Sequence, residues 1–143
     1  MAVSAKVYSK FHLSALLKTI DYTNDTIKIM LCTSAYTPVQ NTHQFKSDVT
    51  SEVSGTGYTA TGATLASKTA ATATTVATFD AADATWPAST ITARYAVVYD
   101  ATPATDATRP LICYIDFGAD VISSGGTFTI TFDPLGIWTM TVS

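Results

Sequence analysis

Apolar and polar residues alternate most regularly in the last third of the chain. Residues 127–132 read Thr-Phe-Thr-Ile-Thr-Phe, the period-two pattern of a strand with one buried face. Residues 91–99 and 111–117 form further apolar runs, and residues 137–142 alternate again. These four segments are predicted to be strands.

Turn residues separate these runs. Ser-Ser-Gly-Gly at 123–126 and Asp-Pro-Leu-Gly at 133–136 predict turns, and Trp86-Pro87 predicts a break before the next strand. Residues 101–109 are expected to form a loop. Segments 128–132 and 137–142 are then expected to pair as a hairpin that closes the sheet.

The N-terminal part predicts the only sizeable helix, over residues 5–18, because apolar residues recur there at helical spacing. A short strand at 20–22, a turn at Asn24-Asp25 and a longer strand at 26–33 follow. The longer strand becomes continuously apolar, which is typical of a strand buried on both faces.

Two less regular segments follow. Residues 34–57 are expected to form a long loop with a helical turn within 45–53, and long loops in compact domains are often binding elements. Residues 58–79 are almost entirely Thr, Ala, Gly and Ser. Strands are predicted near 58–65, 67–71 and 75–79, with a disordered linker as the alternative.

Together these elements predict an all-β fold: an antiparallel β-sandwich or barrel of about eight strands with one short N-terminal helix. We expect one domain over residues 1–143, with an N-terminal helical segment at 1–19 and the long loop at 34–57.

Composition adds an expectation of assembly. Charged residues are 13% of the chain, against about 25% in a typical soluble domain. Thr (27 residues) and Ala (21) are in excess. A surface this poor in charge is weakly protected against self-association, so we expect part of it to be covered by other subunits.

Charge and hydropathy argue against two classes of partner. The net charge is −3 and the eight basic residues are scattered, so no nucleic-acid partner is expected. No apolar run approaches about 20 residues, so no membrane partner is expected. No signal peptide is visible at the N-terminus, and the chain is expected to stay in the cytoplasm in which it is made.

The sequence offers little for catalysis. His12 and His43 stand outside any metal or nucleophile motif, and most of the ten aspartates sit at predicted turns, although calcium remains an alternative for them. Cys32 and Cys113 lie in apolar runs and are expected to be buried free thiols. We therefore predict no catalytic residues, no cofactor and no metal.

Two non-strand regions have apolar residues to spare and are predicted to contact a partner: the segment 5–18 and the loop 34–57. The residues expected to make these contacts are Val7, Phe11, Leu16, Tyr36 and Phe45.

Several segments in a fixed order resemble a widespread family of small virion proteins of tailed bacteriophages. They are residues 1–6 leading to Phe11, then 25–28, 32–38, 52–60, 92–99, 110–112, 115–118 and 136–138. The resemblance covers nearly the whole chain and implies a structural component of the phage particle. Residues 69–77 are richer in Ala and Thr than the family leads us to expect.

The first expectation from this resemblance is a capsid decoration, or cement, protein located on the virion and assembled in the host cytoplasm. It would bind the major capsid protein or other virion subunits, and a homo-oligomer, taken as a trimer, is expected. The alternatives are a neck or tail component and a fibre component with carbohydrate binding.

Overall fold

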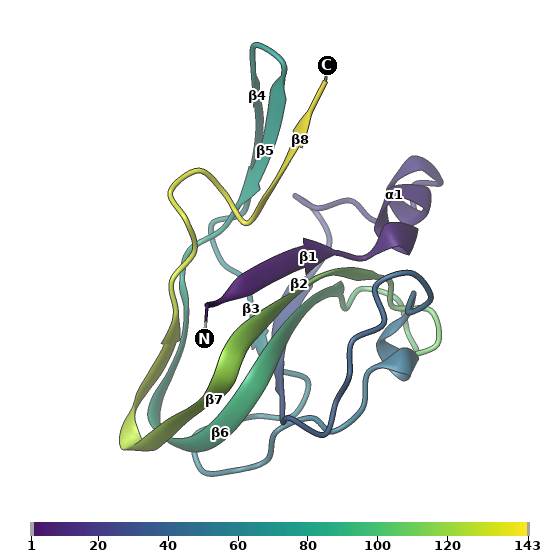
Figure 1. Ribbon diagram of the computed structural model, residues 1–143. Helices are drawn as coiled ribbons and strands as arrows, with labels where there is room; N and C mark the ends of the chain where they lie inside the picture. The colour runs from purple at the N-terminus through teal and green to yellow at the C-terminus, as the bar shows by residue number, and fades with distance from the viewer. Residues whose placement is uncertain (1, 143) are drawn as a thin grey trace.

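The computed structural model describes residues 2–142, which form two antiparallel sheets and one short α-helix (Figure 1). The larger sheet has the order β1-β7-β6-β2-β3, with β1 (Ser4–Val7), β2 (Ile27–Cys32), β3 (Ala63–Thr64), β6 (Ala84–Asp100) and β7 (Leu111–Ile130). The smaller sheet has the order β4-β5-β8, with β4 (Thr69–Ala73), β5 (Val76–Asp80) and β8 (Trp138–Thr141). The helices are α1 (Ser9–Leu16) and the 3₁₀ turn η1 (Lys46–Asp48). The predicted all-β fold of about eight strands with a short helix near the N-terminus is confirmed.

Strands β6 and β7 form one long ribbon that organises the larger sheet. They pair from Ala84 opposite Ile130 to Tyr99 opposite Leu111. Both strands bend together toward the end at which Ala84 lies opposite Ile130 (Figure 1). The register shifts between Trp86 and Ser89, where β6 carries one residue more than β7. Such bulges bend a strand without ending it.

Two sequence predictions were therefore wrong in this ribbon. The expected break at Trp86-Pro87 lies inside β6, and the expected turn at residues 123–126 lies inside β7. Each strand continues because the other provides hydrogen-bond partners across the irregularity. The bulges accommodate Pro87, Ala88 (φ 48°) and Gly125 (φ 71°).

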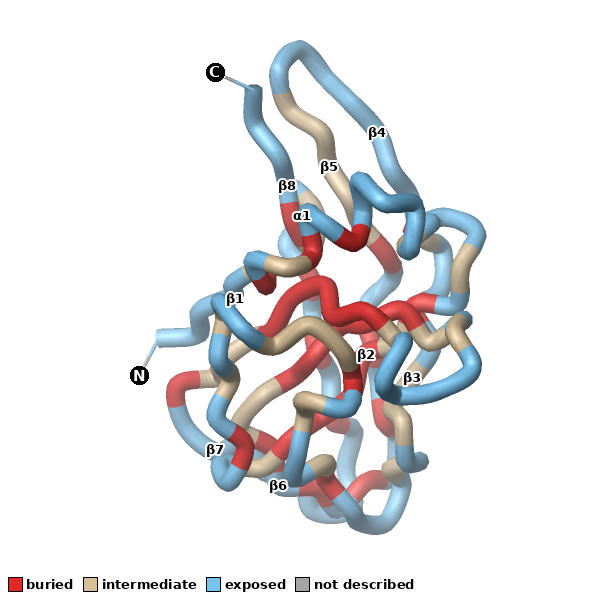
Figure 2. The backbone as a smooth tube through the Cα atoms, turned by 90° about the vertical axis from the view of Figure 1, so that its right-hand side faces the viewer, coloured by how far each residue is buried: buried red, intermediate tan, exposed pale blue. Residues whose placement is uncertain are grey.

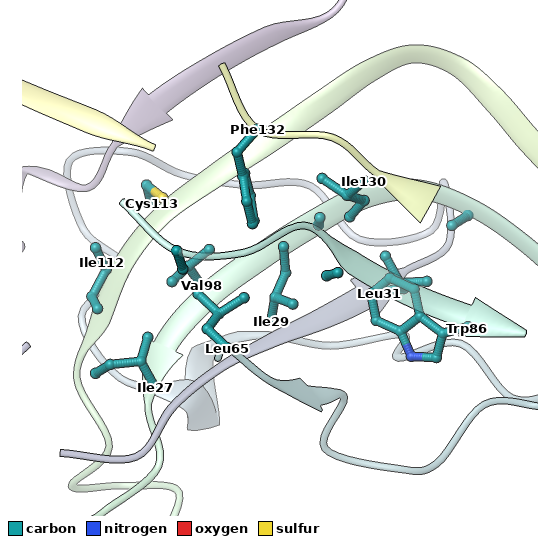
Figure 3. Packing of buried hydrophobic residues seen from close by; sticks show 14 of the residues in the cluster. Ile27, Ile29, Leu31, Leu65, Trp86, Val98, Ile112, Cys113, Ile130 and Phe132 are labelled. Carbon is teal, nitrogen blue, oxygen red and sulfur yellow. The ribbon is translucent and has the colours of Figure 1, made fainter. Parts of the chain in front are cut away.

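The main hydrophobic core lies inside the bend of the ribbon (Figure 3). Ile27, Ile29 and Leu31 of β2 point into it, together with Trp86 and Ile130 from the ends of the ribbon. The intervening β2 residues Met30 and Cys32 belong to a second cluster on the opposite face of the sheet. Burial of β2 on both faces, as its apolar run predicted, is confirmed.

The long loop covers that second face. Tyr36 is 1% exposed and packs in the second cluster with Tyr8, and Val49 packs against the same cluster. Strand bridges join Cys32 to Glu52 and Phe45 to Pro110. Apart from these bridges and η1, the segment is irregular, so the predicted loop with a helical turn is found.

The N-terminal prediction was partly wrong. The predicted helix over 5–18 is shorter, because residues Ser4–Val7 form strand β1 and pair with β7 from Ser4 opposite Asp116 to Val7 opposite Cys113. Pairing with β7 outweighs the helical spacing of the apolar residues here, although residues 4–6 stay exposed. Residues 20–22, predicted as a strand, form irregular structure and the start of a turn instead. Met1, where the predicted segment 1–19 and domain 1–143 begin, lies with Ser143 outside the described residues.

The predicted closing hairpin was also wrong. The turn after Asp133 exists, since the Gly136 N–H donates to the Asp133 carbonyl (2.8 Å), but the next strand, β8, pairs with β5 of the smaller sheet. Gly136 (φ 111°) allows this route because a Cβ there would lie 2.6 Å from Cγ2 of Thr78. The Thr/Ala-rich segment forms strands β3, β4 and β5 rather than a linker.

Candidate interaction surfaces

The smaller sheet projects from the body of the molecule as an arm, which we define as β4, β5 and β8 (Figures 1 and 2). Every residue of β4 is exposed, every residue of β5 is half-buried, and β8 is exposed after Trp138. No residue of 69–79 or 134–142 is ionisable. Apart from Asp80 at its base, the arm is therefore a sheet without ionisable residues, and the rest of the chain leaves it mostly uncovered.

Four aromatic rings fix the base of the arm to the body. The Trp138 ring stacks on Phe79 (4.7 Å between centroids) and meets Tyr22 and Phe11 edge-on at 4.8 and 5.3 Å. The Tyr22 hydroxyl donates to the Asp80 carbonyl (2.7 Å). Aromatic contacts of this geometry stabilise a fold by more than the burial of their apolar area alone, so Trp138 is the main link between arm and body.

An apolar groove of about 260 Å³ lies where α1 approaches the arm, and we name it the arm groove. Its floor is Phe79 and Trp138, and its walls include Leu16, Ile20 and Met140. Leu16 is 84% exposed and Met140 42% exposed. Large apolar side chains left uncovered in one place are typical of interaction sites.

A second apolar groove, of about 400 Å³, lies beside the start of β1, and we name it the β1 groove. Ile115 and Val121 line it from β7, Val3 lines it from just before β1, and Phe132 and Ile137 line it from the segment that leads to β8. Val3 is 65% and Val121 43% exposed. A partner seated here would contact the N-terminal strand and β7 together.

The long loop, by contrast, is tied to the body. The Tyr36 hydroxyl lies 2.8 Å from the Tyr8 hydroxyl and 2.9 Å from Nδ1 of His43. Burial raises the pKa of Tyr36 to about 12, so the phenol stays protonated. Lys46 is buried and its Nζ lies 2.9 Å from the Asp106 carboxylate, which lowers the pKa of that carboxyl. These bonds hold the middle of the loop against the body, and the polar side chains that the loop leaves exposed, among them Thr42, Thr50 and Ser54, lie outside them.

Of the five residues predicted to contact a partner, the structure brings together only Phe11 and Leu16, which both line the arm groove. Leu16 is fully available in the arm groove, whereas Phe11 and Tyr36 are buried in the chain's own clusters. Val7 and Phe45 are half-buried. Contact of these residues with a partner stays a prediction, and the exposed apolar side chains lie in the two grooves rather than at Tyr36.

The arm itself was missed by sequence reasoning. A signal existed in residues 69–79, where eleven consecutive residues carry no charge and no turn residue other than Thr. A strand that stays inside a monomer normally shows apolar anchors at every second position, and this segment has few.

The reactive side chains of the described part of the chain are dispersed. Both cysteines are free and buried, as predicted, and burial raises the pKa of each thiol to about 12. Within residues 2–142 no three His, Cys, Asp or Glu side chains converge as they would around a metal ion. None of the helices in this range combines the length and apolarity needed to cross a membrane.

Comparison with protein-family models, with curated proteins and with solved structures finds no match to this chain.

Proposed function

We propose that this chain is a structural protein of a bacteriophage particle, and that it decorates the head by binding the major capsid protein. The observation that carries the proposal is the surface left uncovered by the chain itself: a neutral projecting arm and two apolar grooves on 143 residues. Such surfaces favour association and are stable when other subunits cover them. The order of segments that resembles small phage virion proteins points the same way.

The β1 groove is the surface that we assign to the shell. It joins the exposed N-terminal residue Val3 to the body of the larger sheet, so one partner segment would contact both. Binding only to assembled shells would stabilise the assembled state by mass action.

Carbohydrate binding on a fibre receives less support. Sugar-binding platforms need exposed aromatic rings, and within residues 2–142 no Tyr, Trp or Phe side chain is exposed. A neck or tail location remains the alternative to the head, and copy number separates the two.

We expect the purified protein to bind expanded, empty phage heads and to raise their melting temperature. Val121→Glu should weaken this binding at least tenfold, because it places a charge in the apolar β1 groove. Ile122→Glu is the matched control: Ile122 is 69% exposed, follows Val121 directly and does not line the groove.

Cosedimentation with heads and calorimetry of the heads measure both effects. Failure to bind any form of the shell would contradict decoration. Equal losses in the Val121 and Ile122 variants would remove the β1 groove from the proposal.

A further inference from the structure

The arm has two open edges, and the strands that form these edges run in the same direction. Strand β5 is antiparallel to both β4 and β8, and it lies between them. Strands β4 and β8 are therefore parallel to each other and form the two edges of the arm. An edge strand presents unpaired backbone N–H and C=O groups to any other strand that reaches it.

The register shows which groups point outward from β8. The Val142 N–H donates to the Thr75 carbonyl (2.8 Å), so the backbone groups of residue 142 face β5. Because inward and outward groups alternate along an antiparallel strand, residues 140 and 138 also face β5. The backbone groups of Thr139 and Thr141 consequently face away from the sheet.

The same alternation gives the free groups of β4. Thr75, directly before β5, and residues 77 and 79 of β5 face β8. Residues 76, 78 and 80 therefore face β4, where they pair with residues 73, 71 and 69. The backbone groups of Ala70 and Thr72 therefore face outward. Both residues are exposed, and among residues 2–142 no hydrogen bond from outside the arm reaches their backbone.

The edges of the arm lack the protection that the edges of the larger sheet have. Of those, β3 is only two residues long and β1 carries Lys6, and short edge strands and edge lysines are two ways in which proteins prevent edge pairing. Strands β4 and β8 carry no charge and no proline. This contrast within one molecule favours pairing of the edges of the arm with strands of another subunit.

We propose that copies of this chain associate head to tail through their arms, the β8 edge of one copy forming a parallel strand pair with the β4 edge of the next. A second copy fits better than a different protein for two reasons. One interface, repeated, covers both open edges of every copy. Such heterologous contacts close into a ring when the rotation between neighbouring copies brings the last copy back to the first. The chain also has a net charge of −3, and the arm is the part of its surface where copies meet without bringing like charges together.

Two proline variants test this pairing. Thr72→Pro removes an outward N–H from β4, and Thr139→Pro removes one from β8; neither N–H serves a bond within the arm, and edge strands tolerate proline at such positions. Thr72→Val and Thr139→Val are matched controls that keep the N–H and the β-branched shape and replace the hydroxyl by a methyl group. Light scattering after size-exclusion chromatography measures the mass, and far-UV circular dichroism checks the fold.

We expect the unchanged protein and both valine variants to form a discrete oligomer of the 15.1 kDa chain, and each proline variant alone to be a monomer. An equal mixture of the two proline variants should give a dimer, because one intact β8 edge meets one intact β4 edge. The mixture is measured at ten times the concentration at which the unchanged protein assembles.

A monomeric unchanged protein, self-association of either proline variant alone, or a mixture that stays monomeric would each overturn the proposal. If a proline variant fails to fold, Thr72→Lys and Thr139→Lys block the same edges by charge and are mixed in the same way. The experiment uses the purified chain without phage heads, so its failure leaves the proposed role on the particle standing.

Discussion

Replacing Trp138 by alanine is expected to lower the free energy of unfolding by about 3–5 kcal/mol, the range for removing a large buried aromatic side chain. Trp138 is 6% exposed and its ring contacts Phe11, Tyr22 and Phe79. These contacts join the arm to the helix and the body, so the loss should also free the arm. Urea unfolding measures the free energy, and hydrogen exchange of the β5 amides reports whether the arm has loosened.

Trp138→Phe is the control for this prediction. Nε1 of Trp138 is buried and has no hydrogen-bond partner in the described range 2–142, and removing an unsatisfied donor relieves the cost of its desolvation. The phenylalanine variant should therefore lose less than half of what the alanine variant loses. Equal losses in the two variants, or an alanine loss below about 1 kcal/mol, would show that the aromatic cluster does not hold the arm.

The second large effect is expected from Asp100→Asn, which should stabilise the protein at pH 7. Asp100 is fully buried, and burial together with the nearby Asp25 carboxyl raises its pKa from 3.8 to about 6. Its Oδ1 accepts a hydrogen bond from the Thr102 N–H (2.8 Å), while Oδ2 has no hydrogen-bond partner among residues 2–142. Keeping a charge there is unfavourable, and asparagine avoids it while retaining the acceptor.

The direction of the pH dependence follows from the raised pKa of Asp100. A group whose folded pKa lies above its unfolded value contributes stability that is complete below the unfolded pKa and is lost as the pH rises through the folded pKa. Between about pH 4 and pH 6 the unchanged protein should lose up to about 3 kcal/mol from this residue, at 1.36 kcal/mol per pKa unit. The asparagine variant should lack this loss, and the two proteins should converge below pH 4.

Asp106→Asn is the control, and for it we expect the opposite dependence of stability on pH. Lys46 and Arg109 lower the pKa of Asp106, so its carboxylate contributes stability that is present above the unfolded pKa and disappears on acidification. Thermal unfolding from pH 2 to pH 8 measures both variants, because the contribution of Asp106 is lost only below about pH 4. An Asp100 variant that is less stable than the unchanged protein at pH 7 would contradict this account of the buried carboxyl.

The sequence was informative where a strand has to bury one or both faces. The continuous apolar run of β2 and the runs at residues 91–99 and 111–117 each predicted a strand that exists, because side-chain burial follows local periodicity. The loop before η1 followed from its irregular pattern in the same way.

The failures concern pairing over long distances. Pro87 and the glycines at 125 and 126 are turn residues by local chemistry, yet the partner strand supplies hydrogen bonds across them and the ribbon continues. Strand β8 joins β5 rather than its neighbour in sequence, a choice made by the aromatic cluster around Trp138. A local sequence pattern predicts neither outcome.

The candidate surfaces were predicted only in part. Spare apolar residues near the N-terminus marked Leu16, which the structure leaves exposed, but the same reasoning marked Phe11 and Tyr36, which the chain itself buries. The uncharged run at residues 69–79 was a signal for the arm, but no sequence pattern shows how far β4 and β5 extend beyond the body.

The most direct test of the proposed function is copy number. Quantitative mass spectrometry of purified phage particles gives the ratio of this chain to the major capsid protein. Decoration predicts a ratio near unity or a simple fraction of it, because the chain would cover the shell. A ratio of a few per cent or less would place the chain at the neck, tail or a fibre and would contradict decoration.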